Sequence, residues 1–224
     1  MTSAPTPSRA AVEMLVREAL MRQVGRPPSA RGAPVLVVNS SARHMHVSPE
    51  SLEILFGKGA KLTVHKMLYQ EGQFASEQTV TLIGPRRRVI PNLRILGPCR
   101  DLTQIELALT DAVQLGMDIP VRMSGDIKGT PGGYVMGPAG MLEMKDGIIR
   151  AARHAHMSPA EAKFYGVKHL DKITLKVTSQ GCTTRFDDLI ARVDPSFKLE
   201  VHIDTDEANA CDLERATKVE LLKP

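Results

Sequence analysis

A nine-residue stretch occurs twice in this chain and restricts its fold more than any other feature. Residues 41–49 read Ser-Ala-Arg-His-Met-His-Val-Ser-Pro, and residues 151–159 read Ala-Ala-Arg-His-Ala-His-Met-Ser-Pro, with six of nine positions identical. The two copies begin 110 residues apart in a chain of 224 residues. Because an internal repeat indicates a duplicated structural unit, we expect two similar domains.

Each copy predicts a strand that carries two histidines and leads into a short helix. Side chains at positions i and i+2 of a strand point to one face, so His44 pairs with His46, and His154 with His156. Serine and proline follow each pair. Serine caps a helix N-terminus, and proline suits the first helical position because its missing N–H would have no partner there.

The histidine pairs predict a metal site. Two imidazoles on one face can bind Zn²⁺, which then needs one or two further protein ligands. The alternative is a structural role, with the histidines hydrogen-bonded near a helix start; a single pair would favour it, whereas two equivalent pairs favour metal. Glu106, which shares a strand face with Gln104, is a candidate oxygen ligand, and His202 is a candidate third nitrogen ligand.

A glycine-rich segment, residues 124–140, contains six glycines. It has no Walker or Rossmann spacing, and most of its glycines indicate turns between short strands. Glycine permits close approach of the backbone to a ligand. Ser124-Gly125 is therefore the candidate anion-binding segment.

The remaining pattern predicts a mainly β fold. Apolar segments are short, closely spaced and separated by glycine and proline, which favours small β-barrels over a βαβ sheet. No apolar run is long enough to span a membrane, and acidic residues interrupt the N-terminal apolar stretch, so no signal peptide is expected. Three cysteines without paired spacing indicate a reducing compartment.

The net charge of +4 does not predict nucleic-acid binding. Residues 1–34 hold five arginines and two glutamates, or +3, which leaves +1 for the body of the chain. Tryptophan is absent and aromatic residues make up 4% of the chain, which argues against base stacking.

The first 34 residues predict a helix on a tether. Residues 9–25 have helical periodicity, and residues 26–34 have the composition of a linker. Such a helix is marginal alone in water, so we expect it to dock on a partner; the alternatives are packing on its own domain or an extension without function. The apolar face consists of Val12, Leu15, Val16 and Ala19.

Several ordered motifs resemble those of the PduL-type phosphate acyltransferases. These are the two Arg-His-x-His-x-Ser-Pro copies, Leu-Gly-Pro-x-Arg at 96–100, Thr-Gln-x-Glu at 103–106, and His202 with the acidic segment 204–210. The resemblance covers about residues 35–213. The N-terminal extension resembles the encapsulation peptides of members packaged inside bacterial microcompartments, which implies shell proteins as partners and the microcompartment lumen as location.

The resemblance implies two small β-barrels capped by short helices, with a dinuclear zinc site between them. Residues 35–46 with 155–224 would form the first barrel, residues 47–154 the second, and a homodimer is expected. His44, His46 and Glu106 would bind one Zn²⁺ of the chain, and His154, His156 and His202 the other. Arg100 and Ser124 match phosphate-holding positions, and Arg100 and Glu106 are the expected catalytic residues.

The implied activity is that of a phosphotransacylase, which interconverts acyl-CoA and phosphate with acyl phosphate and CoA. No Ser-His-Asp or Cys-His set is evident, so we expect direct transfer without an acyl-enzyme. The acyl chain stays open between propanoyl, which the resemblance implies, and acetyl or another short acyl group. The alternatives are a zinc-dependent thioester or other hydrolase, and a non-catalytic, shell-associated metal-binding protein.

Overall fold

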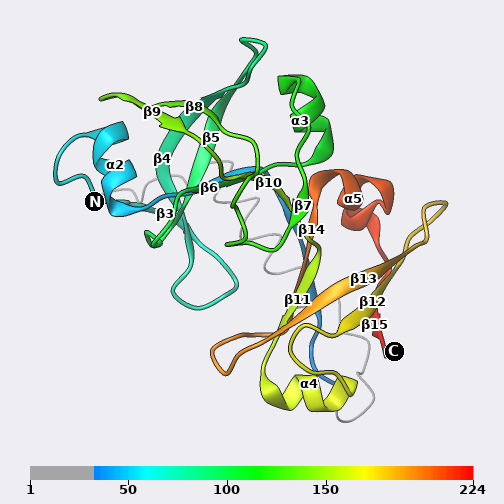
Figure 1. Cartoon of the computed structure of the whole chain (residues 1–224). Helices are drawn as coiled ribbons and strands as arrows, with labels where there is room; N and C mark the ends of the chain where they lie inside the picture. The colour runs from blue at the N-terminus through cyan, green and yellow to red at the C-terminus, as the bar shows by residue number, and fades with distance from the viewer. Residues whose placement is uncertain (1–32, 224) are drawn as a thin grey trace, which may run out of the picture. The chain divides into compact units, whose positions relative to one another are not determined.

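The structure is a computed structural model that describes residues 33–223, and its main compact unit begins at Leu36. It is mainly β, with two curled half-barrel sheets and a few short helices, which confirms the predicted fold class. Figure 1 shows both sheets with the short helices around them. Within the described residues, no helix is long and apolar enough to cross a membrane.

The smaller sheet is built mostly from the C-terminal third of the chain. Its outer strand comes from the beginning of the described chain and pairs in parallel with a strand 163 residues later, Val37 with Glu200. In order across the sheet, the strands are β1 (Val37–Ser41), β14 (Glu200–Asp204), β11 (His154–Met157), β13 (Thr184–Val193), β12 (Lys172–Thr178) and β15 (Lys218–Leu222).

The larger sheet is built from the middle of the chain. In order, the strands are β7 (Val121–Arg122), β10 (Ile148–Ala151), β6 (Gln104–Glu106), β2 (His44–His46), β5 (Val89–Gly97), β4 (Phe74–Ile83), β8 (Gly133–Met136) and β9 (Met141–Met144), while β3 (Val64–Met67) pairs with β4. Each sheet encloses its own apolar core. Met45, Leu82 and Ile105 are fully buried in one core, and Ala155, Leu175 and Val201 in the other.

The two histidine pairs lie in strands, one in each sheet, as the repeat predicts. The chain leaves β1 at Ser41 and passes through two residues into β2 of the other sheet. The predicted division into residues 35–46 with 155–224, and 47–154, stays a prediction. The pairing adds that β1 belongs with the C-terminal strands, whereas His44–His46 pair within the larger sheet.

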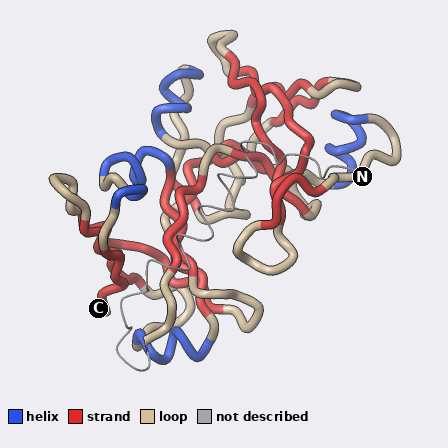
Figure 2. The backbone as a smooth tube through the Cα atoms, turned by 180° about the vertical axis from the view of Figure 1, so that it is seen from behind, coloured by secondary structure: helices blue, strands red, loops and turns tan. Residues whose placement is uncertain are grey.

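The predicted helix starts are present after both histidine pairs. Ser48 caps α2 (Pro49–Phe56) by accepting the backbone N–H of Ser51 at 3.2 Å. Ser158 caps α4 (Pro159–Tyr165), and Glu161 returns a bond to the Ser158 backbone at 2.7 Å. The other helices are α3 (Leu109–Leu115), α5 (Thr205–Ala210) and the 3₁₀ turn η1 (Leu213–Arg215). Figure 2 shows the helices as short segments between strands.

Strand pairing extends the repeat beyond what the sequence displays. In the larger sheet β2 lies between β5, which is parallel, and β6, which is antiparallel. In the smaller sheet β11 lies between β13, which is parallel, and β14, which is antiparallel. A helix begins three residues after Glu106 and three residues after His202. Strand β6 with α3 therefore corresponds to strand β14 with α5.

Candidate active site

The first group of possible metal ligands is assembled by the pairing of β2 with β6. His44 lies directly opposite Glu106 in this ladder, and His46 lies on the same face as His44. The Nε2 atoms of His44 and His46 are 3.1 Å apart, and Nε2 of His44 is 3.5 Å from Oε2 of Glu106. All three residues are buried. The structure thus brings together the three residues expected to bind one metal ion.

The second group has the same construction in the smaller sheet. His154 lies directly opposite His202 in the β11–β14 ladder, and the two rings stack with centroids 5.0 Å apart. The ring of His156 lies edge-on to both, at 4.8 Å from His154 and 5.0 Å from His202. The ligand atoms of these three residues lie within 4.8 Å of one another.

Hydrogen bonds fix which nitrogen of each leading histidine is available. Nδ1 of His44 lies 2.8 Å from the carbonyl oxygen of Ala42, and Nδ1 of His154 lies 2.8 Å from that of Ala152. A carbonyl only accepts, so Nδ1 of each ring carries the proton and Nε2 presents a lone pair. This is the arrangement found in histidines that bind metals.

The residues present fit a zinc ion. Two nitrogens on one tetrahedral Zn²⁺ are separated by about 3.3 Å, given Zn–N bonds of about 2.0 Å, and the Nε2 atoms of His44 and His46 are at 3.1 Å. Among residues 33–223, buried ring nitrogens of His46, His156 and His202 have no hydrogen-bond partner. Such a cost is rarely accepted in a folded protein unless a ligand compensates for it.

The electrostatics keep the histidines neutral. Burial and the neighbouring charges of His44 and Arg100 lower the pKa of His46 to about 3. Burial and His202 lower the pKa of His154 to about 4, and burial, His154 and His202 lower that of His156 to about 2. Neutral imidazole is the form that binds a metal ion. These rings therefore need not lose a proton at neutral pH before binding one.

Glu106 remains ionised despite its burial. Burial raises the pKa of this carboxyl, but the adjacent His44, His46 and His154 lower it by more, so that it lies below its ordinary value. His154 belongs to the second group, which indicates that the two groups are electrostatic neighbours. A carboxylate between two sets of imidazoles supplies the negative charge that two cations would require.

Arg100 and Ser124 are brought together, as expected for phosphate-holding residues. The backbone N–H of Arg100 donates to the carbonyl of Val47 at 2.9 Å, which places the arginine beside the first group. Its Nη1 lies 3.5 Å from the hydroxyl of Ser124. The Ser124 hydroxyl also accepts from Gln104 at 2.9 Å, and the backbone N–H of Gly125 donates to Gln104 at 2.7 Å.

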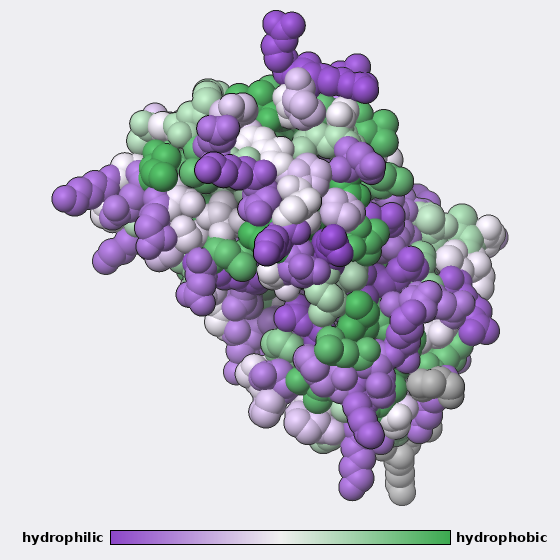
Figure 3. Space-filling view, in the orientation of Figure 1, coloured by the Kyte–Doolittle hydropathy of each residue, from purple (hydrophilic) through white to green (hydrophobic). Residues whose placement is uncertain are grey.

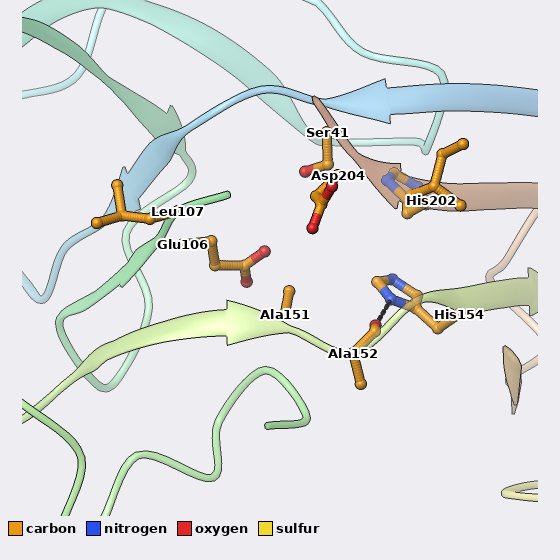
Figure 4. Close-up of a pocket in the computed structure, with 9 residues that line it drawn as sticks. Ser41, Glu106, Leu107, Ala151, Ala152, His154, His202 and Asp204 are labelled. Atoms are coloured by element: carbon orange, nitrogen blue, oxygen red, sulfur yellow. Dashed lines mark hydrogen bonds between the residues drawn. The ribbon is translucent and has the colours of Figure 1, made fainter. Parts of the chain in front are cut away.

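The two groups open onto one small cavity of about 20 Å³, roughly the size of one water molecule. Figure 4 shows the carboxylate of Glu106 on one side of this cavity and the rings of His154 and His202 on the other. Ser41 and Asp204 also line it. The cavity therefore joins residues from the two halves of the repeat.

Sequence reasoning missed Arg192 on β13. It is the register partner of His156 on the adjacent strand, and its guanidinium lies 5.9 Å from the ring of Phe197, which in turn lies 4.3 Å from His156. Burial lowers the pKa of Arg192, and Glu106 acts against this. Within the described chain, neither Arg192 nor Arg100 has a carboxylate within 4.0 Å. Only the strand pairing indicates this arginine, because it lies 36 residues beyond its partner.

Sequence reasoning also missed Glu200, which is 2% exposed and lies two residues before His202. Its Oε2 is 3.1 Å from Nε2 of His202 and accepts from Gln70 at 2.6 Å, while its other oxygen accepts from Asn39. Burial raises the pKa of Glu200, but His202, Gln70 and Asn39 lower it by more. The alternation of residues 199–203 was a usable signal, since it places Glu200 on the face of His202.

The other predicted residues have no place at this site. Val12, Leu15, Val16 and Ala19, the expected partner-binding face, lie outside the described residues. Cys99 is half-buried, Cys182 is exposed and Cys211 is buried. Burial raises the pKa of the Cys99 thiol, so it is predominantly protonated at neutral pH and a weak nucleophile.

Comparison with known proteins identifies the relatives of this chain. The family model for phosphate propanoyltransferase matches residues 37–214. A phosphate propanoyltransferase of Planctopirus limnophila is 56% identical, over 97% of this chain and 92% of that protein. One of Thermotoga maritima is 49% identical over 80% and 85%, and one of Salmonella typhimurium 45% identical over 76% and 80%.

These matches confirm the resemblance to phosphate acyltransferases that the motifs predict, and with it the expectation of an acyltransferase enzyme. The matched region includes both histidine pairs, Arg100, Glu106, Ser124 and His202. On both kinds of comparison, the chain belongs to the phosphate propanoyltransferase family.

Proposed function

We propose that this protein is a phosphotransacylase that interconverts a short acyl-CoA and phosphate with acyl phosphate and CoA. Propanoyl is the proposed acyl group, because the relatives are named for it. The observation that carries the proposal is the meeting of two ligand groups at one cavity, beside a pair of arginines without carboxylate partners in the described chain.

Two Zn²⁺ ions are the proposed cofactors. His44, His46 and Glu106 would hold one, and His154, His156 and His202 the other. When bound, zinc would supply Lewis acidity toward the carbonyl oxygen and affinity for the departing sulfur. Imidazole and carboxylate ligands also suit Co²⁺ and other first-row ions, so metal analysis of the purified protein must identify the ion.

The two arginines are proposed to hold the phosphate. Arg100 and Arg192 are half-buried, and each lowers the stability of the charge on the other, as the effect of Arg192 on the pKa of Arg100 indicates. A phosphate dianion between them would relieve this repulsion and accept charge-assisted hydrogen bonds. Ser124, at 3.5 Å from Arg100, would offer its hydroxyl to the same anion.

The proposed reaction is a direct transfer. A phosphate oxygen forms a bond to the thioester carbonyl carbon, the bond from that carbon to sulfur breaks, and the proton of hydrogen phosphate passes to the departing thiolate. No charge is left unbalanced, and no amino-acid side chain becomes acylated. Arg100 and Arg192 orient the attacking phosphate, and Gln104 and Ser124 hold the surroundings of Glu106 in place.

One assay separates this activity from its rivals. Release of CoA from propanoyl-CoA is measured with and without phosphate, before and after removal of bound metal. Phosphate-dependent release that disappears with the metal and returns with Zn²⁺ supports the proposal. Release without phosphate identifies a hydrolase, and no release, with unfolding after metal removal, identifies a non-catalytic metal-stabilised protein.

The N-terminal segment is proposed to direct the enzyme to the lumen of a bacterial microcompartment by binding a shell protein. The support is the apolar face of Val12, Leu15, Val16 and Ala19 together with the linker that follows it. The alignment with the Planctopirus protein covers 97% of the chain, so it includes most of residues 1–34.

A homodimer is the proposed assembly. Apolar side chains are exposed on the neighbouring strands β8 and β9, where Met136 and Met141 are register partners that are 46% and 53% exposed. Figure 3 shows apolar side chains in separate areas among polar ones on the face in view. Light scattering of the protein and of a Met141→Lys variant tests whether strand β9 contributes to self-association.

A further inference from the structure

The third ligand in each group is preceded by a polar residue in an equivalent place. Gln104 lies opposite His46 in the β2–β6 ladder, and Glu200 lies opposite His156 in the β11–β14 ladder. Both residues are buried, at 0% and 2% exposure. Each stands two positions before the third ligand, Glu106 or His202, and shares its strand face.

Gln104 contacts Glu106 as a donor. Its Nε2 lies 2.7 Å from Oε1 of Glu106. Its Oε1 accepts the backbone N–H of Gly125 at 2.7 Å, which fixes the amide in the orientation that points the donor at Glu106. An amide suits this place, because a carboxylate there would repel Glu106.

Glu200 contacts His202 with the opposite polarity. Its Oε2 lies 3.1 Å from Nε2 of His202, although off the direction of the ring N–H, so that the contact is electrostatic rather than an aligned hydrogen bond. The carboxylate cannot move freely, because Asn39 from β1 and Gln70 from the β3–β4 loop both donate to it. Gln70 is itself held, since it donates to the carbonyl of Lys198 at 2.9 Å.

We propose that Gln104 and Glu200 are matched positioning residues, each with the polarity that its own metal ligand requires. The amide serves a carboxylate ligand in one half of the repeat, and the carboxylate serves an imidazole ligand in the other. This inference rests on the proposed metal sites. Partners of metal ligands commonly orient them, and their loss weakens metal binding by about 10- to 100-fold.

Single substitution tests the Glu200 half of the inference without relying on activity. Native mass spectrometry counts bound Zn²⁺ per chain, and chelator competition measures the affinity of each site. Glu200→Gln should keep one tightly bound ion and weaken the other by about 10- to 100-fold. Glu220→Gln is the matched control, because Glu220 lies on β15 and pairs only with exposed Lys218 at 2.7 Å in the described chain.

A compensating pair of substitutions separates positioning from a merely structural role. His202→Glu alone places two carboxylates side by side and should lose the second ion. The double variant Glu200→Gln with His202→Glu reproduces the Gln-x-Glu order of residues 104–106 and should bind the second ion about 10- to 100-fold more tightly than His202→Glu alone. Circular dichroism of each variant verifies that it is folded.

The outcomes are distinct from those of the proposed function. If the unmodified protein binds no metal, the metal sites themselves are wrong. If it binds two ions, but Glu200→Gln binds both with unchanged affinity, the positioning role of Glu200 is overturned. The matched polarity is overturned if the double variant binds the second ion no better than His202→Glu.

Discussion

The Nε2 atoms of His44 and His46 face each other at 3.1 Å inside the protein. The proton of His44 is held on Nδ1 by the carbonyl of Ala42, so its Nε2 can only accept. In the described chain Nδ1 of His46 lacks a partner, which leaves this ring without the anchor that His44 has. A cation between the two Nε2 atoms satisfies both rings, and several measurements follow from this arrangement.

Replacing Glu106 by alanine should lower phosphate-dependent CoA release by at least about 100-fold. The reason is that loss of a direct ligand should exceed the 10- to 100-fold effect of losing a ligand's partner. Steady-state rates and metal content of the variant are the measurements. Glu143→Ala serves as control, because Glu143 is exposed and contacts only Tyr134 among its described neighbours. A fully active Glu106→Ala enzyme would contradict the assignment.

Replacing Arg192 by alanine should raise the KM for phosphate by about 10- to 100-fold, since hydrogen bonds to charged groups contribute about 1.5–3 kcal/mol. The KM for propanoyl-CoA should change much less. Arg185→Ala on the same strand is the control, because that side chain is 61% exposed and pairs with Asp187. Equal KM values for phosphate in the two variants would remove Arg192 from the anion site.

Replacing Cys99 by alanine should leave the transfer rate unchanged. The thiol is half-buried with a raised pKa, and direct transfer requires no nucleophile from the protein. Mass spectrometry of the enzyme quenched during turnover with propanoyl-CoA should show no added acyl mass. An acyl adduct on Cys99, Cys182 or Cys211 that forms and decays at the rate of turnover would replace direct transfer by a covalent route.

The metal-free protein should lose stability as the pH falls from 7 to 5. His46 and His154 have pKa values of about 3 and 4 in the folded chain, against 6.5 in the unfolded chain. Below pH 6.5 the unfolded state therefore binds protons that the folded state does not, and each group lowers the free energy of unfolding by up to about 1.4 kcal/mol per pH unit. Urea unfolding at several pH values measures the slope.

His65→Ala gives the control for this slope, because His65 is exposed on β3. Its pH dependence should equal that of the unmodified protein, whereas His156→Ala should show a shallower one. A free energy of unfolding that stays constant between pH 7 and pH 5 would mean that the buried rings are already protonated in the folded chain.

Deleting residues 1–34 should leave kcat and KM unchanged in dilute solution, since every residue proposed for the site lies within 35–214. The same deletion should abolish co-purification with microcompartment shells or change the assembly state. A fusion of residues 1–34 to an unrelated fluorescent protein tests whether the segment is sufficient for packaging. Loss of activity on truncation would instead make the segment part of the folded enzyme.

Local periodicity was enough to predict the parts of the site that lie within one strand. His44 and His46 share a face because alternate residues of a strand must, and Ser48 and Ser158 cap helices because Ser-Pro fits a helix start. Gln104 and Glu106 were expected on one face and are in contact. All of these relationships involve residues at most three positions apart.

Relationships between strands were beyond local reasoning. Glu106 and His202 entered the ligand sets through family resemblance, because no spacing in the sequence shows that β6 pairs with β2 or β14 with β11. Arg192 and Glu200 were missed for the same reason: each is significant only as the neighbour of a histidine on another strand. The equivalence of Gln104 with Glu200 becomes visible only once the ladders are aligned.

The position of β1 has a consequence for the order in which the protein is made. On the ribosome Val37–Ser41 emerge early, yet their partners in β14, Glu200–Asp204, are among the last residues to be synthesised. Until then the first strand has no edge to join, and the site of His154 and His156 lacks its third imidazole. The larger sheet can form during translation, whereas the smaller sheet can close only after the chain is nearly complete.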